Sequence, residues 1–123
     1  MTSLVQVSVK TLADILDPFN APIWGDIVTK EDVEKALDEN RLISDSKSQD
    51  HAGKIAYFVV NAPREPILID VGTEDYLLDW IIDDGNHRLC GSIFAGREHI
   101  AADISGNCDL IEALFGKEAV LDD

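Results

Sequence analysis

Hydrophobic and polar residues alternate over several short stretches of this chain, and this pattern predicts its strands. Residues 3–9 place valines on one side and mostly polar side chains on the other, a period of two typical of a half-buried strand. Three further runs, residues 54–61, 66–71 and 76–82, are rich in branched and aromatic side chains and are separated by turn clusters. Residues 99–104 return to the strand pattern. We expect these runs to pair as strands of one sheet.

Helices are predicted between and after these runs from their capping residues. Thr29 followed three residues later by Asp32 is a variant of the capping box, and it predicts a surface helix that ends near Asn40. Residues 86–95 have a helical pattern, and Gly96 supplies a left-handed conformation that ends this second helix.

Two further helical segments are predicted near the ends of the chain. Residues 11–16 read as one short helical turn after the first strand. Asn107 can cap a last helix that Gly116 closes. The apolar face of this last helix consists of Leu110, Ile111, Leu114 and Phe115.

Two segments are predicted to be loops. Residues 17–26 contain two prolines, a glycine and two aromatic residues, so we expect an ordered loop anchored by Phe19 and Trp24. Residues 44–53 are almost entirely polar, which predicts a flexible loop outside the core. His51 lies in this polar loop and is interpreted as a plain surface residue.

Together these elements predict an α+β fold, a small mixed sheet flanked by short helices. The length of 123 residues fits a single domain spanning residues 1–123. No stretch approaches the roughly 18 uncharged apolar residues of a membrane-spanning helix, and the first ten residues do not resemble a secretory signal. We therefore expect a soluble, cytoplasmic protein. Cys90 and Cys108 lack a metal-binding spacing, and we interpret both as free, mostly buried thiols.

Acidic residues strongly outnumber basic ones. There are 24 Asp and Glu against 10 Lys and Arg, which gives a formal net charge of -14. This excess repels nucleic-acid phosphates at long range and argues against direct nucleic-acid binding. It suits a basic protein partner or divalent cations, and it is also typical of a well-solvated surface. The net charge alone does not choose among these.

The turn that follows residues 76–82 is where we expect chemistry. Its sequence is Asp83-Asp84-Gly85-Asn86-His87-Arg88. The first backbone N–H groups of the next helix have no intrahelical partner and, together with the helix dipole, they attract anions. Gly85 permits a positive φ angle or a close approach by a ligand, and the imidazole and guanidinium are further donors. The turn predicts a phosphate site formed by Gly85, Asn86, His87 and Arg88.

The two aspartates before the glycine are candidate metal ligands. Mg²⁺ commonly takes one or two carboxylates together with phosphate oxygens, so Asp83 and Asp84 are suited to an ion that bridges to a bound triphosphate. The alternative is that these residues are structural. Asp84 or Asn86 can cap the helix. The basic pair His87 and Arg88 can form local salt bridges with Asp83, Asp84 or Glu98. Both interpretations stay open at this point.

Residues 82–100 resemble the signature of the ParB/sulfiredoxin-like superfamily. That signature is a strand, then Gly-x-His-Arg or Gly-x-Arg-Arg, a short helix of small and apolar residues, a glycine, and a strand that opens with Ile. The matching features here are Gly85-Asn86-His87-Arg88 and Gly96. Upstream, residues 31–37 are similar to the family's early helix and residues 66–70 to its Pro-Ile-x-Val strand. The resemblance implies a ParB/sulfiredoxin-like fold.

This resemblance, which covers residues 27–104, also implies a pocket for the phosphates of ATP or CTP with Mg²⁺. The family's glycine turn and its two basic residues contact phosphates, and they correspond to Gly85, His87 and Arg88. The catalytic cysteine of sulfiredoxin corresponds to Asn86, so sulfinic-acid reduction is not expected. Nor do we expect the helix-turn-helix DNA-binding domain that follows this unit in ParB proteins.

Two main hypotheses of function follow. The first is a nucleotide-phosphate-binding domain that carries out Mg-dependent phosphoryl transfer or hydrolyses a phosphodiester or NTP, with Asp84 as general base and Glu98 second. Its weakness is the shortage of cations, since Arg88 and Arg97 are the ones expected near the turn. The alternative is a non-catalytic acidic module, a DNA mimic or mobile-element inhibitor that binds a basic protein partner. In a third hypothesis the turn is only a structural corner of an oligomerising domain.

Overall fold

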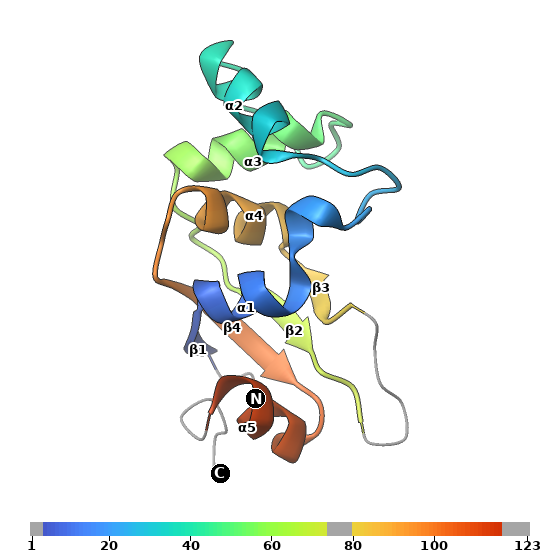
Figure 1. Cartoon of the computed structure of the whole chain (residues 1–123). Helices are drawn as coiled ribbons and strands as arrows, with labels where there is room; N and C mark the ends of the chain where they lie inside the picture. The colour runs from blue at the N-terminus through green and yellow to red at the C-terminus, as the bar shows by residue number, and fades with distance from the viewer. Residues whose placement is uncertain (1–3, 74–79, 117–123) are drawn as a thin grey trace.

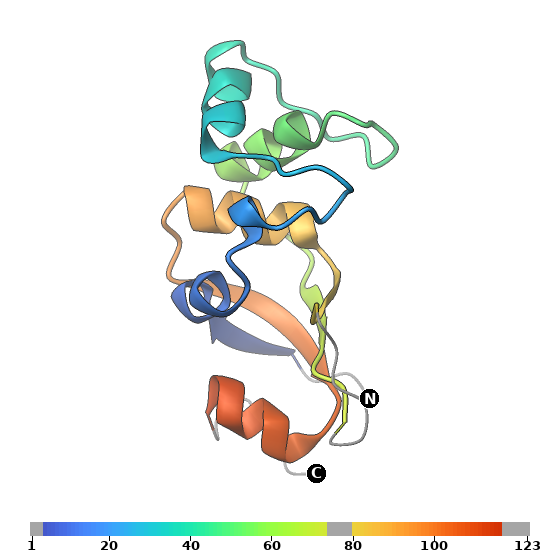
Figure 2. The same ribbon diagram turned by 45° about the vertical axis from the view of Figure 1, so that its right-hand side comes forward.

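The structure, a computed structural model of the chain, describes residues 4–73 and 80–116. Within these ranges it is a mixed α+β fold, which confirms the predicted class. The helices are α1 (Val9–Leu16), the 3-10 helix η1 (Pro18–Asn20), α2 (Lys30–Asp38), α3 (His51–Val60), α4 (Asn86–Phe94) and α5 (Cys108–Phe115). Figure 1 and Figure 2 show α2 and α3 at one end of the molecule, α4 between them and the sheet, and α5 at the other end.

The sheet has four strands in the order β1-β4-β2-β3 among the described residues. They are β1 (Leu4–Ser8), β2 (Ile67–Asp70), β3 (Ile82–Asp84) and β4 (His99–Ser105). The central strand β4 pairs antiparallel with β1 and parallel with β2, while β2 pairs antiparallel with β3. The sheet is therefore mixed, as predicted, and β3 at its edge delivers the chain directly into α4.

The strands predicted at residues 3–9, 66–71 and 99–104 are confirmed by β1, β2 and β4. The strand predicted at residues 76–82 lies mostly outside the described part of the chain. In the part that is described, β3 begins at Ile82 and continues through Asp83 and Asp84. Both aspartates are therefore part of the strand that leads into the turn.

The strand predicted at residues 54–61 is wrong, because this segment belongs to the helix α3. Its apolar, β-branched and aromatic composition favours a strand locally, but a short apolar run does not distinguish a buried strand from a buried helix. Here α3 is covered on two sides, by α2 and by α4, and its buried residues include Ile55 and Ala56. Packing in three dimensions thus overrides local strand propensity.

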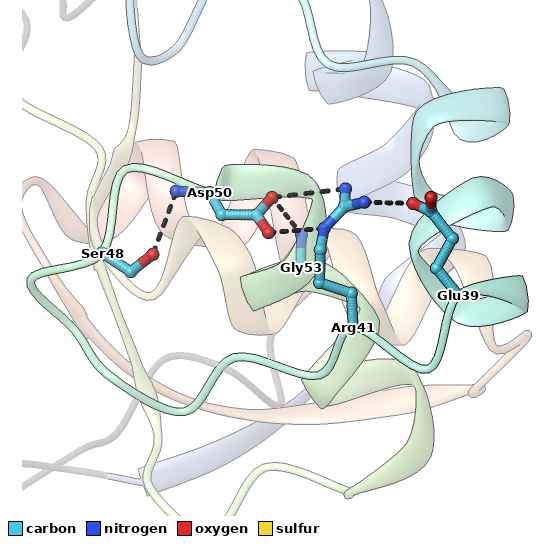
Figure 3. A network of polar contacts seen from close by, with 5 residues as sticks. All are labelled: Glu39, Arg41, Ser48, Asp50 and Gly53. Carbon is cyan, nitrogen blue, oxygen red and sulfur yellow. Dashed lines mark hydrogen bonds and ion pairs between the residues drawn. The ribbon is translucent and has the colours of Figure 1, made fainter.

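The first turn of α3 is held by a polar network around Asp50 (Figure 3). Asp50 is the N-cap residue, and its carboxylate accepts a hydrogen bond of 3.0 Å from the backbone N–H of Gly53. The same carboxylate accepts a bond of 2.6 Å from Nε of Arg41, whose guanidinium also contacts Glu39. Burial by itself would raise the pKa of Asp50, but the Gly53 and Arg41 hydrogen bonds outweigh it and hold the pKa below its usual value.

Two apolar clusters meet at α4. Leu89 of α4 packs into a cluster with Ile67, Ile69 and Ile100 of the sheet. The next residue, Cys90, packs into a second cluster with residues of α2 and α3. A Cβ atom on Gly91 would lie 2.6 Å from Cβ of Phe58, so the glycine permits close packing of α3 on α4. The N-terminus of α4 is therefore held between the sheet and α3.

Most of the other predicted features are confirmed. Thr29 and Asp32 form the capping box of α2, with hydrogen bonds of 3.2 Å and 2.9 Å. Asn107 caps α5, and Phe19 is buried as an anchor of its loop. Of the two cysteines, both free, Cys108 is exposed, which corrects the expectation of two mostly buried thiols.

No helix of the described part of the chain has the length and apolar character needed to cross a membrane.

Candidate functional site

The turn between β3 and α4 is built around Gly85. This residue is the N-cap of α4 and has φ 98° and ψ 24°, in the left-handed region that favours glycine. No side chain caps this helix, so the capping role considered for Asp84 or Asn86 is wrong. A Cβ atom on Gly85 would lie 2.5 Å from Cγ2 of Ile67. The backbone needs glycine here both for its conformation and for its close contact with β2.

Arg88 lies over this turn with its side chain only 13% exposed. Its Nη2 atom donates to Asp84 at 3.1 Å and its Nη1 atom donates to Glu65 at 3.3 Å. The side chains of Asp84 and Glu65 are 68% and 83% exposed, so both contacts are pairs with well-solvated carboxylates and are individually weak. Nε of Arg88 is buried and has no hydrogen-bond partner. The local salt bridge considered for the basic pair is therefore present at Arg88.

A cavity of about 390 Å³ opens beside the start of α4. Residues from three parts of the chain line it: Ile43, Ser44, Ser46, Lys54, Phe58, Asp84, Gly85, His87 and Arg88. We call it the Lys54 cavity, after the basic residue that α3 contributes. It brings together one ammonium, one guanidinium and one imidazole, whereas Asp84 is the single carboxylate among its lining residues.

Lys54 is 8% exposed, and its ammonium donates to the carbonyl oxygen of Ser46 at 2.7 Å. An ammonium has three N–H donors, so this bond leaves two of them. Because a buried ammonium is costly unless it is paired, these two donors favour a negatively charged group in the cavity. Lys54 also holds the loop that carries Ser44 and Ser46 against the cavity.

His87 is surrounded by aromatic rings on the side of α4 that faces α3. The indole of Trp24 stacks on the imidazole of His87 with ring centroids 4.3 Å apart, and on that of His51 at 4.7 Å. Nδ1 of His51 lies 3.0 Å from Nε2 of His87, within hydrogen-bond distance. Burial, followed by the charges of Lys54 and Arg88 and the neighbouring His51, lowers the pKa of His87 to about 4. The His87 imidazole is therefore neutral at pH 7.

The remaining candidates of the turn have other neighbours. The side chain of Asn86 accepts a hydrogen bond of 2.9 Å from Nε1 of Trp80, and it does not line the Lys54 cavity. Asp83 and Asp84 are both exposed, the register of β3 against β2 is irregular between them, and of the two only Asp84 lines the Lys54 cavity. Within the described residues there is no group of three or more His, Cys, Asp or Glu side chains suited to a metal. A Mg²⁺ ion at this turn would need the oxygens of a bound phosphate in addition to the aspartate carboxylates.

Glu98 and Arg97 lie beyond the opposite end of α4, a helix about 13 Å long. Glu98 lines a separate cavity with residues such as Ser8 and His99. The guanidinium of Arg97 donates to the carbonyl oxygens of Phe58 and Val59 at 2.6 Å and 3.0 Å, so it satisfies the C-terminal end of α3. The structure does not bring either residue to the Lys54 cavity.

Three residues of this region were missed by sequence reasoning as site residues: Trp24, His51 and Lys54. Asp50 is a normal N-cap residue, and a helix that starts after it places His51 and Lys54 three positions apart on one face. This capping signal was available, but the polar composition of residues 44–53 favoured a loop. The contact between Trp24 and the two histidines has no signal in the sequence.

A larger cavity of about 940 Å³ adjoins the Lys54 cavity and shares Ser44, Ser46, Phe58 and Arg88 with it. Its other lining residues are Tyr57, Val60, Asn61, Ala62, Pro63, Arg64 and Glu65. Arg88 therefore lines both cavities, the smaller one together with Lys54 and His87 and the larger one together with Tyr57 and Asn61.

Comparisons of the chain with protein-family models, with curated proteins and with solved structures give no match.

Proposed function

We propose that this chain binds the phosphate groups of a nucleotide in the Lys54 cavity, as a ParB/sulfiredoxin-like domain would. The observation that carries the proposal is the convergence of Lys54, His87 and Arg88, from two helices, on one cavity at the N-terminus of α4. Phosphate oxygens match this set, since all three side chains can donate hydrogen bonds and the first amides of α4 have no intrahelical partner. Lys54 supplies the cation that the sequence alone did not place here.

The net charge of -14 opposes binding of a polyanion, but this repulsion acts only over a short distance in salt. At physiological ionic strength the Debye length is about 8 Å, so carboxylates elsewhere on the surface are largely screened. Lys54 and Arg88 lie at the cavity itself and are mostly removed from solvent. Two cations and one carboxylate, Asp84, line this cavity, so its local charge favours a bound phosphate.

The adjoining larger cavity offers space for the rest of a nucleotide. Tyr57 and Pro63 supply apolar surface, and Asn61 supplies amide donor and acceptor atoms. Such a mixture is typical of pockets that take a small organic ligand. In this proposal the phosphates lie beside Lys54 and the base and sugar lie beyond Arg88.

The proposal is for binding and does not include turnover. Of the two residues considered as general base, Asp84 lines the Lys54 cavity and is paired with Arg88, while Glu98 lies beyond the far end of α4. Asp84 is also the single carboxylate of that cavity that could contact a magnesium ion brought in by the nucleotide.

Thermal unfolding in the presence of tripolyphosphate, ATP and CTP, each with and without Mg²⁺, tests the proposal. A probe present at 100 times its Kd should stabilise the fold by about 2.7 kcal/mol. Arg88→Met and Lys54→Met should remove this shift, whereas Lys10→Met, a change of equal charge on the exposed face of α1, should keep it. Arg88→Met alone decides the question if Lys54→Met does not fold. No shift in the wild type, or an undiminished shift in Arg88→Met, would overturn the proposal and favour the acidic-module alternative.

A further inference from the structure

The histidine pair behind the Lys54 cavity leaves one ring nitrogen of His87 uncommitted. His87 lines the cavity, and its Nε2 atom lies 3.0 Å from Nδ1 of His51. Nδ1 of His87 is therefore the ring nitrogen that remains for an anion. The indole of Trp24, nearly parallel to both imidazoles, restricts the rotation of the two rings.

Two neutral imidazoles at this distance share one proton, and its position decides what His87 offers to an anion. With the proton on Nε2 of His87, Nδ1 carries a lone pair, which repels a phosphate oxygen. With the proton on Nδ1 of His51, Nε2 of His87 is the acceptor, and the proton of neutral His87 is on Nδ1. The tautomer of an imidazole is set by the hydrogen bond at its other nitrogen, so the tautomer of His87 depends on whether Nδ1 of His51 donates or accepts.

We propose that His51 and Trp24 are positioning residues of the phosphate site, which hold His87 as the neutral Nδ1–H tautomer so that it donates to a bound phosphate. In this arrangement Nδ1–H of His51 donates to Nε2 of His87. The inference rests on the proposed function, since it describes how one of the three donors of that site is prepared.

The charges around the pair favour a neutral imidazole at His87. Lys54 of α3 and Arg88 of α4 both oppose a positive charge on His87. Asp50, the N-cap of α3, favours a positive charge on His51, but burial and Lys54 outweigh it and lower the pKa of His51 as well. A neutral Nδ1–H donor needs no proton uptake when a phosphate binds, so the site keeps its donor throughout the neutral pH range.

The position of His51 is itself fixed by the network of Figure 3. His51 is the first residue of α3, directly after the N-cap Asp50, whose carboxylate is bonded to Gly53 and Arg41. Arg41 thus holds the carboxylate of Asp50, Asp50 caps the first turn of α3, and this turn places His51 beside His87. Each of these contacts is a hydrogen bond of 3.0 Å or less.

The test uses the full chain, with tripolyphosphate as the probe. The tautomer of His87 is read from ¹⁵N NMR of histidine-labelled protein without the probe, and we expect Nδ1–H. His51→Phe keeps an aromatic ring beside Trp24 but removes the donor, and it should weaken tripolyphosphate binding about three- to tenfold at pH 7.5, the usual range for one hydrogen bond. His51→Asn places an amide N–H near the position of Nδ1 and should restore most of the affinity.

A pH series separates positioning from a general structural effect. Protonation puts a hydrogen on Nδ1 of His87 in every variant, so the ratio of Kd values between His51→Phe and wild type should stay constant from pH 8 to pH 5.5 and shrink as the pH falls further towards 4, the pKa of His87. The ionisation of tripolyphosphate affects both Kd values equally, so it does not change their ratio. His99→Gln, which changes the exposed histidine at the start of β4, is the matched control and should bind as the wild type does.

The outcomes distinguish this inference from the proposed function. An Nε2–H tautomer of His87 in the wild type, or a His51→Phe protein that binds tripolyphosphate as tightly as wild type at every pH, overturns the inference while phosphate binding stands. A wild-type protein that does not bind tripolyphosphate at all overturns the proposed function, and the inference with it. Should His51→Phe not fold, His51→Asn and the wild-type tautomer still decide.

Discussion

The guanidinium of Arg88 lies directly over Gly85, so that a Cβ atom on Gly85 would be 3.0 Å from both Nε and Nη2 of Arg88. The same atom would be 2.5 Å from Cγ2 of Ile67, and the backbone at Gly85 has φ 98°. Glycine is therefore required at this position for two independent reasons, the left-handed conformation and the lack of space. Both the strand-to-helix turn and the placement of Arg88 depend on it.

Gly85→Ala should destabilise the fold by about 2 to 4 kcal/mol, the sum of left-handed strain and overpacking. Gly96→Ala is the matched control, because Gly96 also has a positive φ, 73°, but no neighbour within 4 Å of the added Cβ. It should cost only about 1 kcal/mol. Urea unfolding of the two variants measures the difference, and equal costs would contradict the close contact with Ile67 and Arg88.

Acidification should destabilise the protein partly through His87. The pKa of His87 is lowered to about 4 in the folded state, against 6.5 for the unperturbed side chain. Between these values the unfolded chain binds more protons than the folded one, so stability is complete above pH 6.5 and decreases as the pH falls towards 4. For this half-buried histidine we expect a loss of about 2 kcal/mol across that window.

Urea unfolding between pH 7.5 and 4 measures this loss. His87→Phe should show a smaller decrease in stability than wild type, whereas His99→Gln should follow the wild type. Carboxylates contribute their own acid dependence to all three proteins, so the difference between the curves is the relevant quantity. Parallel curves for His87→Phe and wild type would show that His87 does not carry a lowered pKa.

Removal of the α3 N-cap should affect both stability and binding. Asp50→Ala removes the acceptor for Gly53 and for Arg41, and it should cost about 1 to 2 kcal/mol of stability. Thr29→Ala removes the cap of α2 and should cost a similar amount. Only Asp50→Ala should also weaken tripolyphosphate binding, because Asp50 positions the turn that carries His51 and Lys54. Calorimetric titration of both variants with tripolyphosphate measures this. If the two variants bind equally tightly, the Asp50 cap does not contribute to the phosphate site.

The two cysteines should differ sharply in reactivity. Burial raises the pKa of the Cys90 thiol to about 12, and Cys90 packs in the cluster between α3 and α4. Cys108 is exposed at the start of α5. A thiol reagent such as Ellman's should modify one thiol per folded chain at pH 8 and both after unfolding. Cys108→Ser should abolish the fast reaction, and fast modification of that variant would contradict the burial of Cys90.

Features with a local cause were predicted correctly. The capping box of Thr29 and Asp32, the cap at Asn107, and the left-handed glycines 85 and 96 depend on residues within a few positions of one another. The alternation in residues 3–9 reflects one buried face of a strand. In each case the physical cause lies within one turn of helix or one strand, so the sequence contains it in full.

Features that depend on distant packing were not predictable in the same way. The run at residues 54–61 has strand composition, yet it is helical because α2 and α4 enclose it. Glu98 and Arg97 do not line the Lys54 cavity, because the length of α4 separates them from the turn at Gly85. Residue types suggested the chemistry of these positions, but only the tertiary structure shows which side chains lie side by side.

By itself, the amino-acid sequence determined the mixed α+β class, the caps of α2 and α5, and the glycine turn that leads into α4. Only the tertiary structure decided that Lys54 lines the same cavity as His87 and Arg88 and that His51 and Trp24 contact His87. Capping, turn conformation and alternation come from interactions between near neighbours in the chain. The cavity arises where α3 packs on α4, and His51 and His87 meet there across 36 positions of sequence because buried apolar surface brings their helices together.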